Sequence, residues 1–189
     1  MAVPPTKGIV RLSRRMAVLC LLLAVAMLSL NAASWIVPGG TGLAGLDLGF
    51  GSEGELLATL GISSQDLAWW QRLGAVVLSS VPLLALTGGL LHLRRLFQGY
   101  ARGEYFSPVA ASHLGKGGRA VLAWVVLKLL CEPLLSAWLT MAQPPGHRMV
   151  TLTIGTGTVV ALFLAACVTV VAYILGRASE LAQENSQFV

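Results

Sequence analysis

Two ionisable residues lie inside an apolar stretch where charged groups are rare. Lys128 and Glu132 are separated by one helical turn, so they share one face of a helix. A charge at the centre of a membrane costs about 2.5 to 3.5 kcal/mol on insertion scales, so we expect both side chains to face other protein. They form either a structural ion pair that fixes helix packing or a site that moves a proton or an ion. A charge supplied by a partner subunit, or a shallower position in the membrane, remains open too. Pro133 follows directly and is expected to kink the helix.

The other residue types that carry out chemistry are scattered along the chain. Each cysteine lies alone in an apolar run, without the spacing of a zinc or redox motif: Cys20, Cys131 and Cys167. His92 and His113 are expected on one side of the membrane and His147 on the other, so the three do not form one metal site. No Ser-His-Asp, paired-carboxylate or HExxH pattern occurs. We therefore expect no enzyme activity, no metal and no cofactor.

Four long apolar runs are the elements that must hold these residues. Hydrophobic residues make up 56% of the 189-residue chain and charged residues only 11%, against roughly 25% charged in a soluble domain. An apolar run of about 20 residues crosses the hydrocarbon layer as a helix. We therefore predict an all-α fold, an integral membrane four-helix bundle in a single domain. Its four spans and its tail are predicted at residues 16–37, 71–93, 120–141, 150–175 and 176–189.

The first apolar run has a second interpretation, as a signal peptide. Basic residues precede it, as they do in signal peptides: Lys7, Arg11, Arg14 and Arg15. Residues 31–33, Asn-Ala-Ala, resemble a cleavage site. However, the run continues to Val37, which is long for the apolar part of a signal peptide. We favour an uncleaved span.

The basic residues predict the orientation of the spans. Lys and Arg gather before the first span, with four residues, and between the second and third spans, with five, and the tail adds Arg177. The other two connections contain only Arg72 and Arg148. Because Lys and Arg are enriched in cytoplasmic connections, both termini and the middle connection are predicted to be cytoplasmic (N-in, C-in). Membrane orientation explains the net charge of +5 better than nucleic-acid binding, which we do not expect.

Short interfacial helices are predicted in two connections. Ser52 and Glu55 have the spacing of a capping box, and Gly61 is placed to end the helix that follows. Ser107 and Pro108 have the pattern of an N-cap and a first helical turn. We expect a glycine-rich stretch to end this second short helix before the third span: Gly115, Gly117 and Gly118.

Small residues predict close packing of the fourth span. Gly157, Ala161 and Ala165 recur at every fourth position, and such stripes let membrane helices approach closely. A pore lining made of the neighbouring threonines is the alternative. We favour helix packing.

Two stretches of sequence resemble a known family. One contains RLF at residues 95–97 and YARGEYFS at 100–107, and the other is ELAQENSQFV at 180–189. Together with four spans in this order, they resemble the uncharacterised bacterial family known as domain of unknown function 2975. Residues 114–117 depart from the more arginine-rich stretch expected there. The resemblance implies a bacterial inner-membrane protein, and it supplies no catalytic residues.

The resemblance also implies a partner. Members of the family are often encoded beside a small helix-turn-helix regulator, which implies a membrane partner or antagonist of a transcription factor. We expect such a regulator to contact the middle connection and the tail, at Tyr100, Arg102, Glu104, Phe106, Glu184 and Phe188. The lipid bilayer and a second copy of the chain are the other expected partners.

The alternative function is that of a small transporter or channel-like subunit that uses Lys128 and Glu132. Four helices are few for a device that opens to alternate sides of a membrane. Transport would therefore need a dimer or another subunit.

Overall fold

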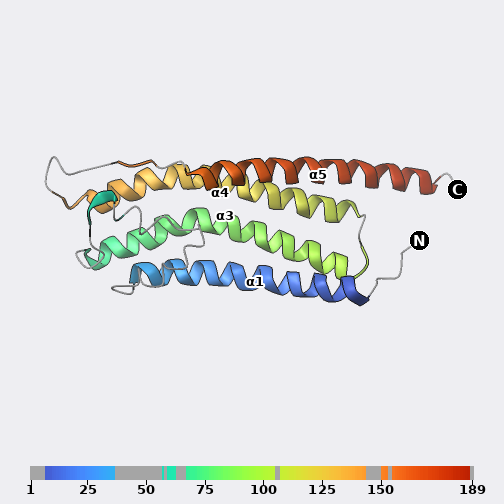
Figure 1. The fold of residues 1–189 in the computed structure, drawn as a ribbon, viewed down its shortest axis with the longest axis horizontal. Coiled ribbons are helices and arrows are strands. Elements are labelled where there is room, and N and C mark those ends of the chain that lie inside the picture. Colours follow the sequence, from blue (N-terminus) through green and yellow to red (C-terminus); the bar gives the residue numbers. More distant parts are fainter. Residues whose placement is uncertain are drawn as a thin grey trace. The chain divides into compact units, whose positions relative to one another are not determined.

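The computed structural model is helical throughout the part of the chain that it describes, and no strand occurs there. The described residues are 7–36, 57, 59–62, 67–104, 107–143, 150–152 and 155–187. Within them, four helices are long and apolar enough to cross a membrane. They are α1 (Lys7–Ile36), α3 (Trp69–Ala101), α4 (Pro108–Thr140) and α5 (Thr156–Gln187) (Figure 1). These helices confirm the all-α prediction and indicate a multi-pass membrane protein.

Each helix is longer than a bilayer's apolar layer requires. The four contain 30 to 33 residues, and a rise of about 1.5 Å per residue gives a length of about 45–50 Å. The hydrocarbon layer is about 30 Å thick. Each helix is therefore longer than a perpendicular crossing of the hydrocarbon layer needs.

The helices contribute to two compact units. The first unit contains Met1–Ala24, Leu86–Leu122 and Val160–Val189, and the second contains Val25–Ala85 and Ala123–Val159. The predicted docking residues belong to the first unit, and Lys128 and Glu132 belong to the second. A single domain over residues 1–189 stays a prediction.

Glycines of α4 lie where neighbouring helices touch it in the first unit. A Cβ atom at Gly118 would lie 2.5 Å from Thr169 Oγ1 and 3.2 Å from the Ala165 carbonyl oxygen on α5. A Cβ atom at Gly117 would lie 3.3 Å from Leu93 Cγ on α3. A Cβ at Gly118 would force its neighbours to shift, and one at Gly117 would press on the Leu93 side chain, so the absence of a Cβ lets the helices approach.

The predicted small-residue stripe on α5 is used at one of its positions. Ala165 is buried and packs against Gly118, as the prediction of helix packing requires. Gly157, by contrast, has open space where its Cβ would be. Within the stripe, this contact with α4 therefore lies at the last residue, Ala165.

The prediction of a separate short helix after Ser107 is wrong. Ser107 Oγ accepts a hydrogen bond from the Ala110 N–H at 3.1 Å, which is the predicted N-cap. However, α4 then continues without a break to Thr140. A glycine inside a helix costs only about 1 kcal/mol. The close contacts that the glycines allow with α3 and α5 offset this cost, so the helix does not end there.

A glycine does end a short helical segment before α3. Gly61 has a φ of 64°, and the Ile62 N–H donates to the Leu57 carbonyl at 3.1 Å. This bond closes a Schellman motif, which confirms Gly61 as a helix end. Ser52 and Glu55, which were predicted to begin the segment, lie outside the described residues. Its position on a membrane surface stays a prediction.

An apolar core with polar bonds at its edge holds the second unit together. The Trp138 indole N–H donates to the Gln71 carbonyl at 3.2 Å, and Asn31 Nδ2 donates to Ser80 Oγ at 3.0 Å. The core consists of buried apolar residues from the helices and from the segment before α3: Trp35, Leu57, Leu67, Ala75, Leu135 and Leu139. These contacts position the part of α4 that carries Glu132.

The last helix begins later and ends later than the predicted span. It starts at Thr156, with the Thr158 N–H donating to the Gly155 carbonyl at 3.0 Å. It continues to Gln187, so most of the predicted tail belongs to the same helix.

Candidate functional site

The turn between α3 and α4 carries half of the predicted docking residues. After α3 ends at Ala101, the chain reverses at Gly103, whose φ is 88°. The Gly103 N–H donates to the Tyr100 carbonyl at 3.1 Å, and the Glu104 N–H donates to the Gly99 carbonyl at 3.1 Å. These two bonds make a complete Schellman motif. The turn backbone is therefore fixed by its own hydrogen bonds up to Glu104.

Arg102 and Glu104 form an ion pair on the surface of this turn. Arg102 Nε lies 3.1 Å from Glu104 Oε1, and the side chains remain 65% and 47% exposed. The pair lies beside Gly99, because a Cβ at Gly99 would be 3.5 Å from Glu104 Oε2. An exposed ion pair contributes only about 0–1 kcal/mol to stability. Both charges therefore remain accessible to a partner at little cost to the fold.

An aromatic pair lies on the helical turn that precedes the ion pair. The rings of Phe97 and Tyr100 are 6.4 Å apart and nearly perpendicular, at 77°. Both side chains are half-buried, and the adjacent Leu96 is buried. Tyrosine and arginine are enriched among the residues that contribute most to protein–protein binding. Tyr100 and Arg102 therefore give this turn the composition of a docking site.

A contact between two histidines is a feature that the sequence analysis missed. Nδ1 of His92 on α3 lies 3.3 Å from Nδ1 of His113 on α4. One nitrogen must donate and the other accept, so at least one ring is neutral. Arg95, Lys116 and Arg119 act electrostatically on His92, and this positive charge disfavours a metal cation at the pair.

The signal that would have found this contact is the hairpin formed by α3 and α4. Helices joined by a short turn run side by side in opposite directions, so residues on either side of the turn meet. His92 and His113 were expected on the same side of the membrane, but no contact between them was predicted. Among the described residues, no three His, Cys, Asp or Glu side chains come together as a metal site.

The two charged residues of the predicted intramembrane site both lie on α4. Glu132 is buried, with 6% of its surface exposed, and Lys128 is half-buried. Pro133 lies inside α4 without ending it. Whether Lys128 and Glu132 act as a structural pair or as a functional site stays a prediction.

The structure brings some of the predicted docking residues together and leaves others untested. Tyr100, Arg102 and Glu104 share one turn. Glu184 lies on α5, with its side chain outside the description. Phe106 and Phe188 lie outside the described residues. The predicted contribution of the tail therefore stays a prediction.

Comparisons with known proteins place this turn inside a recognised stretch of sequence. A family model with the description "Protein of unknown function (DUF2975)" matches residues 57–189. No curated protein and no solved structure matches the chain. The matched residues include α3, α4, α5 and the candidate turn.

Proposed function

We propose that this chain, which belongs to the DUF2975 family of proteins of unknown function, is a bacterial inner-membrane protein that acts through a cytoplasmic protein partner. In this proposal both termini and the α3–α4 turn face the cytoplasm, because most of the Lys and Arg residues lie at that end of the helices. The chain binds its partner and has no catalytic activity of its own. A small helix-turn-helix regulator is the partner that the family resemblance suggests.

The observation that carries the proposal is the fixed and exposed α3–α4 turn. Its Schellman motif orders the backbone before any partner arrives. Arg102 and Glu104 are accessible beside Tyr100. A preformed surface binds more tightly than a flexible one, because less conformational entropy is lost on binding. This combination favours protein docking.

Exchanging the two charges of the turn tests the proposal. The variant Arg102→Glu with Glu104→Arg keeps an ion pair and the net charge, but it reverses the charges that a partner meets. We expect tagged wild-type protein, gently solubilised from native membranes, to retain a soluble DNA-binding protein in stoichiometric amount. We expect the exchanged variant to lose at least tenfold of it by quantitative mass spectrometry.

A second ion pair offers a matched comparison for this experiment. Arg177 and Glu180 on α5 are also 3.1 Å apart and exposed. They lie in the tail, where docking is also predicted, so the exchange Arg177→Glu with Glu180→Arg tests the tail separately from the turn. Unchanged binding in the Arg102–Glu104 exchange would argue against docking at the turn. Recovery of the chain alone, without a soluble partner, would argue against the proposed function as a whole.

One observation favours transport as a second candidate function. Glu132 is buried within a helix that is apolar enough to cross a membrane, and buried carboxyl groups in such helices often belong to proton pathways. Proton flux into proteoliposomes tests this candidate. If it is correct, flux above that of protein-free liposomes disappears in the folded double variant Lys128→Met with Glu132→Gln. Wild-type proteoliposomes that are as tight as protein-free liposomes would exclude proton transport.

A further inference from the structure

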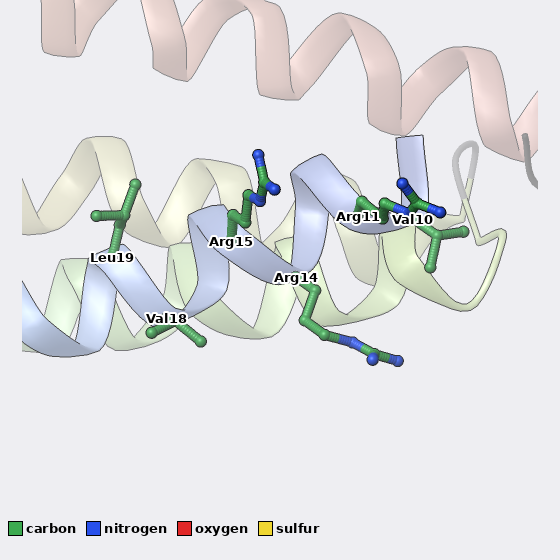
Figure 2. Close-up of a pocket in the computed structure, with 6 residues that line it drawn as sticks. All are labelled: Val10, Arg11, Arg14, Arg15, Val18 and Leu19. Atoms are coloured by element: carbon green, nitrogen blue, oxygen red, sulfur yellow. The ribbon is translucent and has the colours of Figure 1, made fainter. Parts of the chain in front are cut away.

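The exposed side of the start of α1 contains a groove that the proposed function does not use. Its volume is about 570 Å³. Arginine and apolar side chains line it: Val10, Arg11, Arg14, Arg15, Val18 and Leu19 (Figure 2). In Figure 2, Arg14 and Arg15 extend from different sides of α1, with Val18 and Leu19 one helical turn farther along. The groove is therefore cationic toward the start of α1 and apolar toward its middle.

The groove lies on the side of α1 that does not pack against protein. Val18 and Leu19 are 52% and 49% exposed, although both are large and apolar. Ser13, Ala17 and Cys20, at the intervening positions, are buried. Since α1 is a candidate membrane span, its exposed apolar side chains face lipid. The occupant of the groove is therefore expected to come from the membrane.

The positive charge of the arginines in the groove favours an anionic ligand. The sequence of α1 contains no acidic residue. The ion pairs within the described part of the chain join Arg102 to Glu104 and Arg177 to Glu180, not these arginines. A guanidinium group has a planar set of N–H donors that matches the oxygens of a phosphate group. A phosphate ester would complement this cluster in both charge and geometry.

The position of the arginines along α1 matches the depth of lipid headgroups. From Met16 to the helix end at Ile36, α1 carries no charge. A helical stretch of about 20 apolar residues spans the hydrocarbon layer. Arg11, Arg14 and Arg15 directly precede this stretch, so they lie at the edge of the layer, where phosphates are found.

We propose that this groove binds an anionic phospholipid. The headgroup phosphate contacts Arg11 and Arg15, which lie one helical turn apart on one face of α1, and Arg14 adds positive charge at the same depth from the other side. The upper part of an acyl chain lies along Leu19. A free phosphate ion would satisfy the arginines but would leave the apolar half of the groove empty. Clusters of basic residues beside a membrane span are known to recognise anionic lipids. Binding here would fix the end of α1 relative to the bilayer surface.

Photo-crosslinking of the full-length protein tests the proposal. The protein is reconstituted in phosphatidylcholine nanodiscs that contain a phosphatidylglycerol analogue with a photoreactive headgroup, and the adducts are mapped by mass spectrometry. We expect adducts to concentrate in residues 8–19. Unlabelled phosphatidylglycerol should compete for them, whereas additional phosphatidylcholine or inorganic phosphate should not.

Single and triple variants measure the contribution of the arginines. A basic residue near an anionic surface contributes about 1 kcal/mol, so Arg15→Gln should weaken the labelling of residues 8–19 by roughly fivefold. The triple variant Arg11→Gln, Arg14→Gln and Arg15→Gln should weaken it by on the order of 100-fold. The corresponding triple lysine variant keeps the charge but loses the planar donors, so an intermediate result is expected.

A control variant outside the groove tests whether the labelling is specific. Arg177→Gln removes an exposed arginine of α5 outside the groove, so the labelling of residues 8–19 should not change. Thermal unfolding of each variant establishes that it is folded. Equal labelling along all helices, or no effect of the triple glutamine variant, would overturn the proposal. Competition by inorganic phosphate would identify a phosphate-ion site instead and would also overturn it.

Discussion

Replacing Gly118 by alanine should separate α4 from α5, and the expected size of the effect follows from the contact distances. The added Cβ would lie 2.5 Å from Thr169 Oγ1 and 3.2 Å from the Ala165 carbonyl oxygen. Carbon and oxygen atoms in proteins normally stay about 3.4 Å or more apart. Rotating the threonine hydroxyl away would break its hydrogen bond to the same Ala165 carbonyl, which is 2.7 Å long. The substitution must therefore either shift one of the helices or break this bond.

The free energy of unfolding should reflect two opposing effects of this substitution. Overpacking of a well-packed contact costs about 1–3 kcal/mol. Alanine in place of glycine inside a helix contributes about 1 kcal/mol in the other direction. Gly88, in α3, has open space where its Cβ would be, so Gly88→Ala should show only the favourable effect. The difference between the two variants, about 1–3 kcal/mol, isolates the cost of the contact.

Equilibrium unfolding in mixed detergent micelles, followed by circular dichroism, measures this difference. We expect Gly118→Ala to be the less stable variant of the two. Adding Thr169→Ala removes the nearest atom and should restore part of the lost stability, with a coupling energy of about 1–2 kcal/mol. If Gly118→Ala and Gly88→Ala were equally stable, α4 would not approach α5 at Gly118, and the explanation of its glycines would be wrong.

Three further experiments test other contacts. Gly74→Ala should cost about 1–3 kcal/mol of stability in the same unfolding assay, because its Cβ would collide with the indole ring of Trp138; wild-type stability would contradict this contact. Cysteines replacing His92 and His113, in a background without native cysteines, should be joined by a short bifunctional thiol reagent, since the imidazole centroids are 5.5 Å apart; failure to crosslink would argue against the hairpin. Ser107→Ala should cost about 1 kcal/mol through loss of the N-cap, whereas Ser107→Asp should retain stability, and equal values for both would refute the cap.

The helices themselves could be predicted from the sequence because their signals are local. An apolar run of sufficient length forms a helix in lipid whatever its neighbours are, since every backbone group must bond within the segment. The N-cap at Ser107 and the helix end at Gly61 are also local signals, because the side-chain oxygen or the positive φ acts on the adjacent backbone. These features are present in the structure as predicted.

The continuity of α4 could not be predicted from local signals. Gly115, Gly117 and Gly118 look like helix-ending residues when only their backbone freedom is considered. Their value lies in atoms far along the chain, such as Leu93 and Thr169, which occupy the space that a side chain would fill. The sequence shows that a glycine is present, but only the packing shows which neighbouring residue occupies the space of the missing side chain.

The candidate site could be predicted only in part, because it also depends on contacts between residues that are brought together by packing. The sequence places Arg102 and Glu104 in a connection, but it does not show that Gly103 closes a Schellman motif and brings their side chains to 3.1 Å. The contact between His92 and His113 depends on how two helices pair. Contacts between elements follow from packing geometry, which the order of residues along the chain specifies only indirectly.

The packing of α4 and the proposed docking at the turn are physically linked. The turn is held at one end by the bonds around Gly103 and at the other by the Ser107 cap, and the glycine contacts then fix α4 against its neighbours. Gly118→Ala should therefore weaken partner binding only in proportion to the stability that the protein loses. Reversing the charges of Arg102 and Glu104 should abolish binding while the stability stays the same, because an exposed ion pair contributes little to folding. Comparing stability with partner binding in these two variants separates a surface that a partner recognises from a framework that only holds the surface in place.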